Sequence, residues 1–494
     1  MLSTVRERVG VAEAALAVVL VAGVGLRLWL AHAWRPAFLG YPDSDGYIAA
    51  ARLKSAGLLF WNPYRPAGYP LFLSWLHGVH QGLAFAIDVQ HVMGLLVAVL
   101  LYSSVARFVR HRWVALLPAA VVVLSGSELY LEHSPLSEAP YTLLVALALW
   151  LAAYSYGHRG WREALLLFAA GLAIGASAPV RSVGVFVAPA LIGWAAASRP
   201  GWRSRLCGGL VVLAGCLIAL GGYLVYQHGT TGTWSLTRTT GETLYGRAAI
   251  FANCRDFTPP AGTRGLCPAA ADRRLGATWF MFSGTSPATR TFGPAPDPRK
   301  GGAYTWPADG KMLSFAEAAI LHQPWAYLST TLQGLVKYVD PSLGTPGMLE
   351  WNHTTLIESL RGPPSGDITA EIAAYYPDHP TVEHEMGGLD AYARAAKVEG
   401  PVTAILLVLM LVGIVLAREG RRTGAGLFGW TTVLMLLSPV ALLFYGARYA
   451  TPAYGPLAAA AAFGLDAVLD RVPGAWTAFG AVTRHRRPDG FNRR

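Results

Sequence analysis

Apolar runs alternate with short polar segments along most of this 494-residue chain. Several runs approach the roughly 20 apolar residues that an α-helix needs to cross a bilayer. One run, residues 163–198, is too long for one helix and is interrupted at Ala178-Pro-Val-Arg181, so we predict two spans joined by an outer hairpin. The pattern predicts roughly ten membrane-spanning helices, near 11–31, 84–106, 113–126, 139–155, 163–198 (two), 206–226, 401–417, 424–444 and 450–468.

Two segments depart from this pattern. Residues 68–80 are apolar but too short to span, and we predict a helix that lies at the membrane interface or re-enters the membrane. Residues 227–400 form the only sizeable polar segment, for which we predict a soluble unit of mixed secondary structure. Within it, Ser314-Phe-Ala-Glu317 has the capping-box pattern that opens a helix, and Pro324 separates that helix from a second one.

The arginines predict the topology. Arg6 and Arg8 precede the first apolar run, and positive charge before the first helix places the N-terminus in the cytoplasm. Later arginine clusters continue the same sidedness, so both termini are expected to be cytoplasmic. The predicted parts are an N-terminal transmembrane module (1–226) with a first outer loop (32–83), an extracytoplasmic segment (227–400), C-terminal transmembrane helices (401–470) and a basic cytoplasmic tail (471–494).

Composition agrees with a membrane protein. Charged residues make up 14% of the chain and hydrophobic residues 53%, whereas soluble domains have about 25% charged residues. The net charge of +11 could suggest nucleic-acid binding, but most arginines lie in short clusters between apolar runs, which is typical of membrane topology. We expect an all-α polytopic membrane protein that binds no nucleic acid. The excess of arginine over lysine is typical of a GC-rich genome and favours a bacterial plasma membrane.

Two of the four cysteines, Cys254 and Cys267, lie in the polar segment that is expected to face outward. An oxidising compartment would permit a disulfide between them. The sequence leaves the disulfide and two free thiols equally open. Cys207 and Cys216 fall in or beside an apolar run and are expected to be small hydrophobic residues.

Two carboxylates follow the first predicted span. Asp43 and Asp45 lie between Pro42 and Gly46, on a turn that is expected to lead into a helix starting near Tyr47. Acids in this place often cap a helix N-terminus. Two of them at a membrane surface could instead bind a divalent cation or supply a general base. Asp43 and Asp45 are therefore candidate catalytic or metal-binding residues.

Arg181 and Arg448 break the charge pattern, because they stand at predicted outer ends of spans, where positive charge is disfavoured. An arginine near the membrane core costs a few kcal/mol unless it snorkels or finds a partner. Snorkelling would explain either arginine alone. Their location on the same side as Asp43 favours an anionic lipid headgroup, since a guanidinium can contact phosphate through two donors. Glu138, which starts a span, either stabilises that helix N-terminus or joins the same site.

Several of these motifs resemble a known family. Asp43, four residues before Tyr47 and followed by Ala-Ala-Ala-Arg-Leu53, is similar to the first outer loop of polyprenyl-phosphate-sugar-dependent glycosyltransferases. These membrane enzymes of GT-C fold include the protein O-mannosyltransferases and the aminoarabinose transferase of lipid A. Further likenesses lie at Arg65-Pro-Ala-Gly-Tyr69-Pro-Leu-Phe-Leu, Ser137-Glu138, Pro179-Val-Arg181 and Arg448-Tyr449-Ala-Thr-Pro452. Many members carry Asp-Glu where this chain has Asp43-Ser44, so Asp45 replaces that Glu or the substrate differs.

The resemblance implies a hexosyl- or pentosyltransferase of GT-C fold with a polyprenyl-phosphate sugar as donor. The acceptor would be a glycan, lipid or protein on the extracytoplasmic face. Asp43 would act as the base, and Asp45 would orient Asp43 or bind a divalent cation, so a cation cofactor stays an open alternative. Arg181 and Arg448 would neutralise the phosphate leaving group. Other substrate-binding roles would fall to Tyr47, Arg65, Tyr69, Glu138 and Tyr449.

Two other functions stay open. A transporter or flippase for lipid or solute explains intramembrane arginines and outer acids equally well, although the chain lacks the internal repeat of inverted-repeat transporters. A non-catalytic GT-C-like protein that only binds polyprenyl lipid is the third reading. Release of polyprenyl phosphate from a lipid-linked sugar would distinguish a transferase from both.

Overall fold

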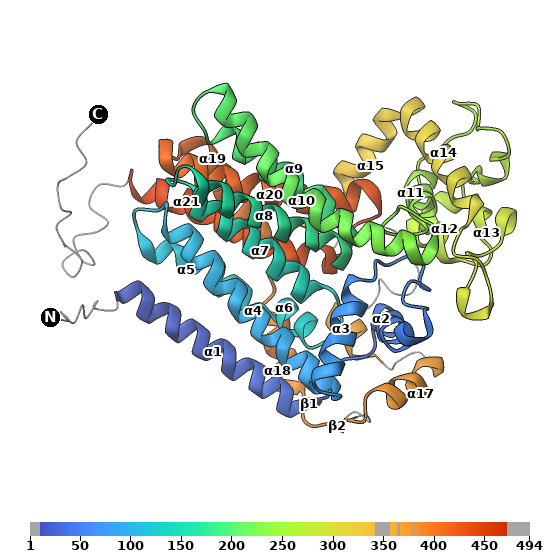
Figure 1. Ribbon diagram of the computed structural model, residues 1–494, viewed down its shortest axis with the longest axis horizontal. Coiled ribbons are helices and arrows are strands. Elements are labelled where there is room, and N and C mark those ends of the chain that lie inside the picture. Colours follow the sequence, from blue (N-terminus) through green and yellow to red (C-terminus); the bar gives the residue numbers. More distant parts are fainter. Residues whose placement is uncertain (1–9, 341–355, 363–365, 379–381, 472–494) are drawn as a thin grey trace.

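The computed structural model describes residues 10–340, 356–362, 366–378 and 382–471, and these residues are mostly α-helical (Figure 1). The predicted basic tail, apart from Arg471, lies outside the described residues, as do Arg6 and Arg8. Within the described ranges the one sheet is an antiparallel pair of two-residue strands, β1 (Trp34–Arg35) and β2 (Val382–Glu383). The all-α expectation is confirmed.

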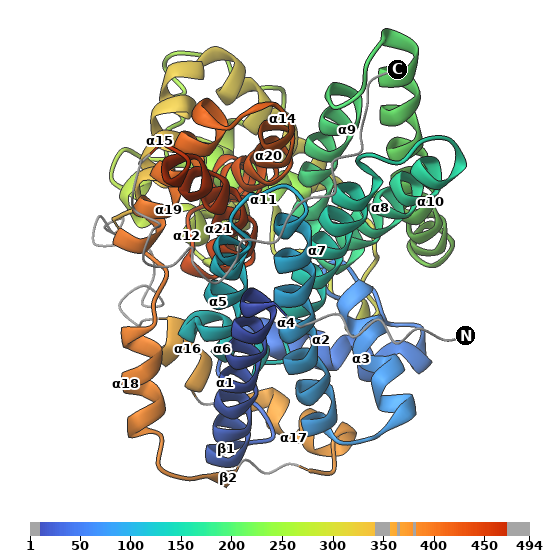
Figure 2. The ribbon, with the colours of Figure 1, turned by 90° about the vertical axis from the view of Figure 1, so that its left-hand side faces the viewer.

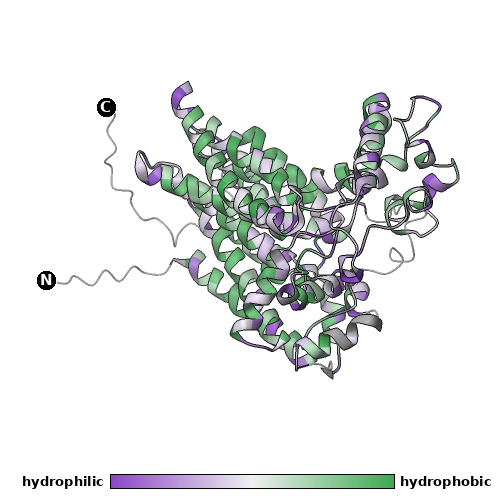
Figure 3. Cartoon of the chain, turned by 45° about the vertical axis from the view of Figure 1, so that its right-hand side comes forward, coloured by the Kyte–Doolittle hydropathy of each residue, from purple (hydrophilic) through white to green (hydrophobic). Residues whose placement is uncertain are grey.

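Seven helices of the described part are long and apolar enough to cross a membrane, and Figure 3 shows their apolar residues as a green belt. They are α1 (Val11–Ala33), α4 (Leu83–Ala106), α7 (Glu138–Ser155), α8 (Trp161–Val180), α10 (Trp202–Thr231), α20 (Glu419–Leu442) and α21 (Ala447–Leu469). Residues 112–132 make an eighth span if their two halves, bent by 52°, count as one. These halves end in α5 (Leu116–Leu124) and α6 (Gly126–Glu132).

Two shorter apolar segments coincide with the remaining predicted spans, namely Ser182–Ala197, which ends in α9 (Ala188–Ala197), and α19 (Pro401–Leu416). The predicted count of roughly ten is thus approximate, because these two are shorter than a full span. The break predicted at Ala178-Pro-Val-Arg181 is confirmed, since α8 ends at Val180. The chain is a multi-pass membrane protein.

Helix α21 forms the centre of the bundle. It packs against α19, α20 and α5, and it is the most buried of the seven candidate spans. Its alanine run, residues 458–462, is at most 1% exposed. Small side chains let membrane helices approach closely and gain dispersion contacts, which replace the hydrophobic effect as the main attraction within a bilayer. The first turn of α21, which carries Arg448, is thereby held firmly in the protein.

The segment between α1 and α4 contains α2 (Pro42–Arg52) and α3 (Gly68–Val79). The short helix expected over residues 68–80 is confirmed as α3. Short 3-10 turns occur at Leu53–Ala56, Arg112–Ala115, Ser182–Val187, Arg264–Leu266, Asp272–Leu275 and Pro298–Lys300.

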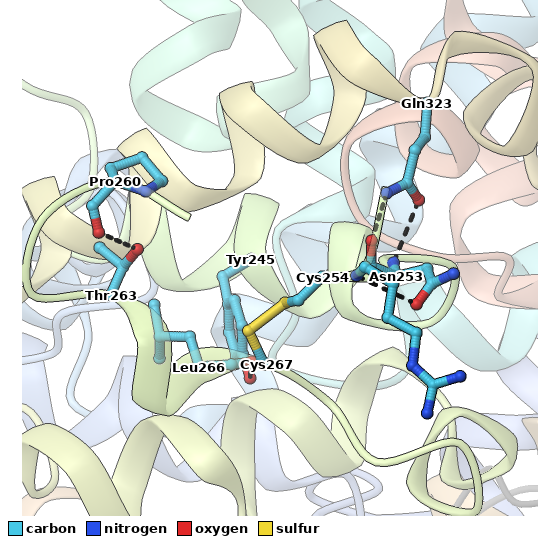
Figure 4. Close-up of a disulfide and its surroundings, with 9 residues drawn as sticks. Tyr245, Asn253, Cys254, Pro260, Thr263, Leu266, Cys267 and Gln323 are labelled. Carbon is cyan, nitrogen blue, oxygen red and sulfur yellow. Dashed lines mark hydrogen bonds between the residues drawn. A yellow bond between two sulfur atoms is a disulfide. The ribbon is translucent and has the colours of Figure 1, made fainter. Parts of the chain in front are cut away.

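The first half of the polar segment has its own apolar core, which includes Tyr245, Phe280 and Phe315. Its helices are α11 (Thr240–Ala249), α12 (Ala277–Phe282), α13 (Pro287–Phe292), α14 (Pro307–His322) and α15 (Pro324–Val336). A disulfide joins Cys254 to Cys267 beside this core (Figure 4). This half is helical with long loops rather than mixed α and β.

The helix that was expected to open at Ser314 begins earlier. α14 starts at Pro307, and the Ser314 hydroxyl donates to the Lys311 carbonyl oxygen at 2.9 Å inside the helix. Pro307 is the start signal instead, because proline suits the first helical turn. The capping-box prediction is wrong. The predicted break is confirmed, since α14 ends at His322 and α15 begins at Pro324.

The second half of the polar segment folds back on the beginning of the chain. It contains α16 (Leu356–Arg361), α17 (Gly366–Tyr375) and α18 (Gly387–Ala395). α16 and α18 contact α6, while α17 contacts α2, and Figure 2 shows them at the β1 end of α1. Tyr130 OH donates to Asp390 Oδ1 at 2.7 Å. The polar segment is thus fastened at the end of the bundle that carries α2.

Candidate active site

Helix α2 carries the two aspartates that the sequence singled out. It begins at Pro42 with Tyr41 as its N-cap, rather than near Tyr47 as expected. Proline favours the first helical position, because its missing N–H needs no partner there. Both aspartates lie in the first turn, and no side chain caps the helix. The capping interpretation of Asp43 and Asp45 is therefore wrong.

Asp43 belongs to a group of five charged side chains, here called the ion cluster, which consists of Asp43, Arg65, Glu138, Arg181 and Arg448. Arg448 lies at its centre. Its Nη1 donates to Asp43 Oδ2 at 2.6 Å, and its Nη2 donates to Glu138 Oε2 at 3.0 Å. Arg65 pairs with the other oxygen of Asp43, and Arg181 pairs with Glu138. The fold brings together five residues that the sequence proposed for one site.

The ion cluster has one net positive charge, because it combines three guanidinium groups with two carboxylates. The Glu138 and Arg448 side chains are 1% and 5% exposed, whereas Asp43 is 21% exposed. Arg181 Nη2 is buried and has no hydrogen-bond partner in the described part of the chain. A buried guanidinium with a spare donor favours an anionic ligand, to which it can make strong charge-assisted hydrogen bonds.

The charge state of Asp43 follows from its partners. Burial alone would raise the pKa of Asp43, but the guanidinium groups of Arg65 and Arg448 outweigh burial and hold this pKa well below its usual range. Asp43 is therefore ionised at physiological pH. The same pairing makes Asp43 a weak base as long as both guanidinium groups remain on it.

Tyrosine rings lie against two of the arginines. The Arg448 guanidinium is 4.5 Å from the ring centroid of Tyr41, and the Arg181 guanidinium is 4.9 Å from that of Tyr449. Cation–π contacts of this kind orient a guanidinium without using its donors. Tyr449 was a predicted site residue. Tyr41 was not, although it stands two residues before Asp43, because no sequence pattern indicates which arginine its ring meets.

Tyr47 and Tyr69 support the site from the bundle interior. Tyr47 OH donates to the Oγ atom of Ser137 at 3.2 Å, and Ser137 is the residue directly before Glu138 in the chain. The rings of Tyr47 and Tyr69 meet edge-on with centroids 4.8 Å apart. Tyr69 OH donates to Gln90 Oε1 at 2.6 Å. Both rings are buried. These two predicted substrate-binding residues therefore pack within the protein, beside the ion cluster.

Asp45 is buried on α2, and none of the ion pairs of the ion cluster involves it. A divalent cation needs several oxygen ligands, whereas both oxygens of Asp43 already accept from guanidinium groups. In the described ranges, no group of three or more His, Cys, Asp or Glu side chains could hold a metal ion. The donor set at Asp43 and Asp45 does not fit the expected cation.

Two glycines permit the close approach of these elements. A Cβ atom at Gly68 would lie 2.4 Å from the Pro179 carbonyl oxygen, so α3 begins directly against the break that precedes Arg181. A Cβ atom at Gly46 would lie 3.0 Å from Arg65 Nη1. A larger residue at Gly68 would push the start of α3 away from α8, because the atoms that it would meet are backbone atoms.

The polar segment holds the loop that carries Arg65. The Arg238 backbone N–H donates to the Pro63 carbonyl oxygen at 2.8 Å. Glu242, in the first turn of α11, is hydrogen-bonded to Tyr64, the residue before Arg65. Burial raises the pKa of Glu242 to about 8, against the lowering effect of that hydrogen bond. No sequence pattern indicated these contacts.

A second buried polar network supports α6, which leads towards Glu138. Arg27 on α1 donates to both carboxylate oxygens of Glu132, at 2.8 and 2.7 Å. His91 Nδ1 lies 3.0 Å from Glu132 Oε2, and His91 Nε2 lies 3.0 Å from His133 Nδ1. An intramembrane arginine requires such a partner. This network fixes the end of α1 that precedes β1 against α4 and α6.

No family model matches the chain, and no curated protein matches it in sequence. The apo oligosaccharyltransferase of Archaeoglobus fulgidus is similar in structure, with a TM-score of 0.51 and 12% identity over 97% of this chain and 52% of that protein. Archaeal oligosaccharyltransferase AglB from the same organism, in complex with an inhibitory peptide and a dolichol-phosphate, has a TM-score of 0.45 and 13% identity. That match covers 96% of this chain and 52% of AglB. ArnT from Cupriavidus metallidurans, bound to undecaprenyl phosphate, has a TM-score of 0.34 and 13% identity. That match covers 92% of this chain and 77% of ArnT.

The apo oligosaccharyltransferase match, with a TM-score above 0.5, defines the class of fold. The chain has the GT-C fold of membrane glycosyltransferases, as its motifs predicted. It spans about half the length of the oligosaccharyltransferase that it matches. At 12% identity the match concerns the fold, so the function must be argued from the ion cluster itself.

Proposed function

We propose that this protein is an integral membrane glycosyltransferase that moves a sugar from a polyprenyl-phosphate donor to an acceptor on the extracytoplasmic face. The net positive charge of the ion cluster beside Asp43 carries this proposal. A polyprenyl-phosphate sugar has one phosphodiester, and its single negative charge would neutralise the ion cluster. The same cluster contains a carboxylate that can accept a proton. Anion binding and base chemistry therefore meet in one site.

Arg181 and Arg448 are the proposed phosphate ligands. Arg181 Nη2 is a buried donor without a partner in the described residues, and Arg448 divides its donors between Asp43 and Glu138. Both guanidinium groups can turn towards phosphate oxygens while Tyr41 and Tyr449 hold their planes. Preorganised donors aimed at developing charge are often the largest catalytic term, and one such donor contributes about 10²–10³ in rate.

Asp43 is the proposed general base. The acceptor hydroxyl oxygen forms a bond to the anomeric carbon, while the bond from that carbon to the phosphate oxygen breaks. The hydroxyl proton passes to Asp43, and polyprenyl phosphate leaves with a second negative charge. The total charge within the site stays constant, because Asp43 loses the negative charge that the phosphate gains. General-base assistance of this type contributes about 10²–10⁴ in rate.

Donor binding would raise the basicity of Asp43. In the free protein burial alone would raise the pKa of Asp43, but Arg65 and Arg448 outweigh burial and hold this pKa well below its usual range. A phosphate on Arg448 would draw that guanidinium away from Asp43 and weaken the hydrogen bond to Oδ2. Asp43 would then be a stronger base with the donor bound than without it. Proton removal from the acceptor is thereby coupled to the presence of the donor.

A groove between α9 and α20 supports a long isoprenoid tail on the donor. The groove has a volume of about 620 Å³, and its walls include Pro189, Trp194, Trp430 and Leu434, with Arg422 near the start of α20. Helix α9 follows Arg181 after one short turn. A lipid whose phosphate lies on Arg181 could therefore extend its tail along α9, within the apolar part of the bundle.

In this proposal the ion cluster faces the outside of a bacterial plasma membrane, and both termini lie in the cytoplasm. The division into modules 1–226, 227–400, 401–470 and 471–494 follows from the same topology. The acceptor would approach from the side of the polar segment, because Arg238 and Glu242 contact the loop that carries Arg65. The polar segment would then help to choose the acceptor.

Reconstituted protein incubated with polyprenyl-phosphate mannose or polyprenyl-phosphate arabinose, plus a cell-envelope acceptor fraction, tests the proposal. We expect polyprenyl phosphate to be released by the wild-type protein and not by the Asp43→Asn variant. Movement of intact lipid across the bilayer without release would instead indicate a transporter. Lipid binding without release or movement would indicate a non-catalytic protein, and both results would contradict the proposal.

A further inference from the structure

We propose that the bundle end opposite to the ion cluster binds the phosphate-bearing headgroup of an anionic membrane lipid. The site is a cavity of about 300 Å³, here called the basic cavity, which is lined by Arg107, Phe108, Tyr156, Arg418, Gly420 and Arg421. It shares no residue with the ion cluster. The proposal goes beyond the transfer reaction and does not depend on it.

Helix α7 sets the separation of the two sites. Its first residue, Glu138, belongs to the ion cluster, and Tyr156, directly after its last residue, lines the basic cavity. An α-helix of 18 residues is about 27 Å long, which is close to the ~30 Å thickness of the bilayer hydrocarbon core. The basic cavity therefore lies at the headgroup level of one membrane face when the ion cluster lies at the other.

Three distant parts of the chain build the basic cavity. Arg107 follows the end of α4, Tyr156 follows the end of α7, and Arg418 and Arg421 lie at the start of α20. Arg107 is oriented by two contacts. Its Nη2 donates to the Tyr156 carbonyl oxygen at 3.1 Å, and its guanidinium lies 4.4 Å from the Tyr154 ring centroid. These two contacts hold the exposed Arg107 side chain against α7, whereas Arg418 is exposed at the start of α20.

The charges of the basic cavity are only partly compensated. Arg421 Nη1 pairs with Asp466 Oδ2 at 2.7 Å and with Asp470 Oδ2 at 2.5 Å. None of the ion pairs in the described ranges involves Arg107 or Arg418. Among the side chains that the structure describes, Arg107 and Arg418 therefore line the cavity without a carboxylate partner. A phosphate-bearing headgroup would supply the missing negative charge and accept hydrogen bonds from both guanidinium groups.

A lipid headgroup is the occupant that fits the location. Anionic headgroups are concentrated at this depth, and basic residues there gain free energy from their surface potential. Phe108 and Tyr156 provide an aromatic wall of the kind that is common at membrane–water interfaces. A free inorganic anion has no apolar part that could pack against these two rings. We therefore assign the basic cavity to a phosphodiester headgroup such as that of cardiolipin or phosphatidylglycerol.

Lipid retention tests the assignment. The full-length protein is reconstituted in phosphatidylcholine bilayers with and without cardiolipin, extracted, and analysed by native mass spectrometry for bound cardiolipin. We expect the double variant Arg107→Gln/Arg418→Gln to retain about tenfold less cardiolipin than the wild type. The single variant Arg418→Gln, at an exposed side chain, should show a smaller loss and guards against a folding defect.

The matched control is Arg159→Gln/Arg162→Gln, which removes two exposed arginines at the same bundle end, Arg159 between α7 and α8 and Arg162 in the first turn of α8. This control should retain cardiolipin like the wild type. Equal losses in the cavity variant and the control would overturn the proposal, and so would no loss in either. Displacement of cardiolipin by millimolar inorganic phosphate would also contradict it, because the cavity would then be a site for free anions.

Discussion

Arg448 Nη1 lies 2.6 Å from Asp43 Oδ2, although the two residues stand 405 positions apart in the chain. The same guanidinium donates to Glu138 through Nη2 at 3.0 Å. One arginine on α21 thus bridges a carboxylate on α2 and a carboxylate at the start of α7. Any anion that binds Arg448 must also change the electrostatic environment of Asp43.

Replacement of Arg448 by lysine should separate charge from geometry. A lysine keeps the positive charge, but its single ammonium group cannot bridge Asp43 and Glu138 through a planar fork. We expect the transfer rate to fall about 100-fold or more, with a higher KM for the polyprenyl-phosphate donor. Steady-state kinetics of reconstituted protein provide the measurement. Arg471→Lys, which alters an arginine bonded to the carbonyls of Ala467 and Leu416, is the control and should remain active.

Gly68→Ala should disturb the site through backbone contact. The new Cβ atom would lie 2.4 Å from the Pro179 carbonyl oxygen, so either the Arg65 loop or the turn before Arg181 must move. We expect destabilisation of roughly 1–3 kcal/mol and a loss of transfer activity. Gly78→Ala, on the same helix with nothing within 4 Å of its Cβ position, is the control. Similar thermal stability and activity of the two variants would argue against the tight contact.

The membrane helices could be predicted because their signal is local. Each apolar run needs only its own composition and length, and Pro179 marks its break within a few residues. The misplacement of Arg181 and Arg448 relative to the charge pattern was also readable, since it depends on the topology of neighbouring loops. In the structure both arginines pair with Glu138 at one end of the bundle.

The contacts within the site could not be predicted, because they join residues that are distant in sequence. Arg65 and Arg448, the two partners of Asp43, stand 22 and 405 positions away from it in the sequence. Tyr41 carries no pattern that indicates its contact with Arg448. Arg27, an arginine within the first apolar run, signals that it needs a partner, but nothing in the sequence indicates that the partner is Glu132. The start of α14 was misplaced because Ser314 and Glu317 imitate a cap, whereas the proline at position 307 was the real signal.

Glu242 should make stability depend on pH. Burial raises the pKa of Glu242 to about 8 from its ordinary value of 4.5, so the folded protein holds this proton more tightly than the unfolded chain. The resulting stabilisation is complete below about pH 4.5 and is lost as the pH rises to about 8. Glu242→Gln should flatten this decline and raise the Tm at alkaline pH.

Thermal unfolding between about pH 5 and pH 9 measures this effect. Glu317→Gln, at an exposed position of α14, is the control and should keep the decline of the wild type. If the Glu242→Gln variant loses stability with rising pH as steeply as the control, another group is responsible.

Removal of the disulfide should weaken the first half of the polar segment. The bond between Cys254 and Cys267 closes a loop with a sequence separation of 13, and a loop of this size contributes about 3 kcal/mol through the unfolded state. The Cys254→Ser/Cys267→Ser variant should therefore be cleaved faster in limited proteolysis of residues 240–336. Cys207→Ser removes an exposed free thiol and should change nothing. Equal cleavage rates for both variants would show that the disulfide adds no stability.

In the proposed reaction Asp43 accepts the proton of the acceptor hydroxyl, and Asp43→Asn tests this role most directly. Asparagine keeps the size of the side chain but cannot take up this proton. Release of polyprenyl phosphate from the lipid-linked donor should fall about 10²–10⁴-fold, while the protein stays in the membrane and still binds the donor. Asp45→Asn, two residues away and outside the ion cluster, should retain far more activity. Transfer by the Asp43→Asn variant at a rate near that of the wild type would contradict the account.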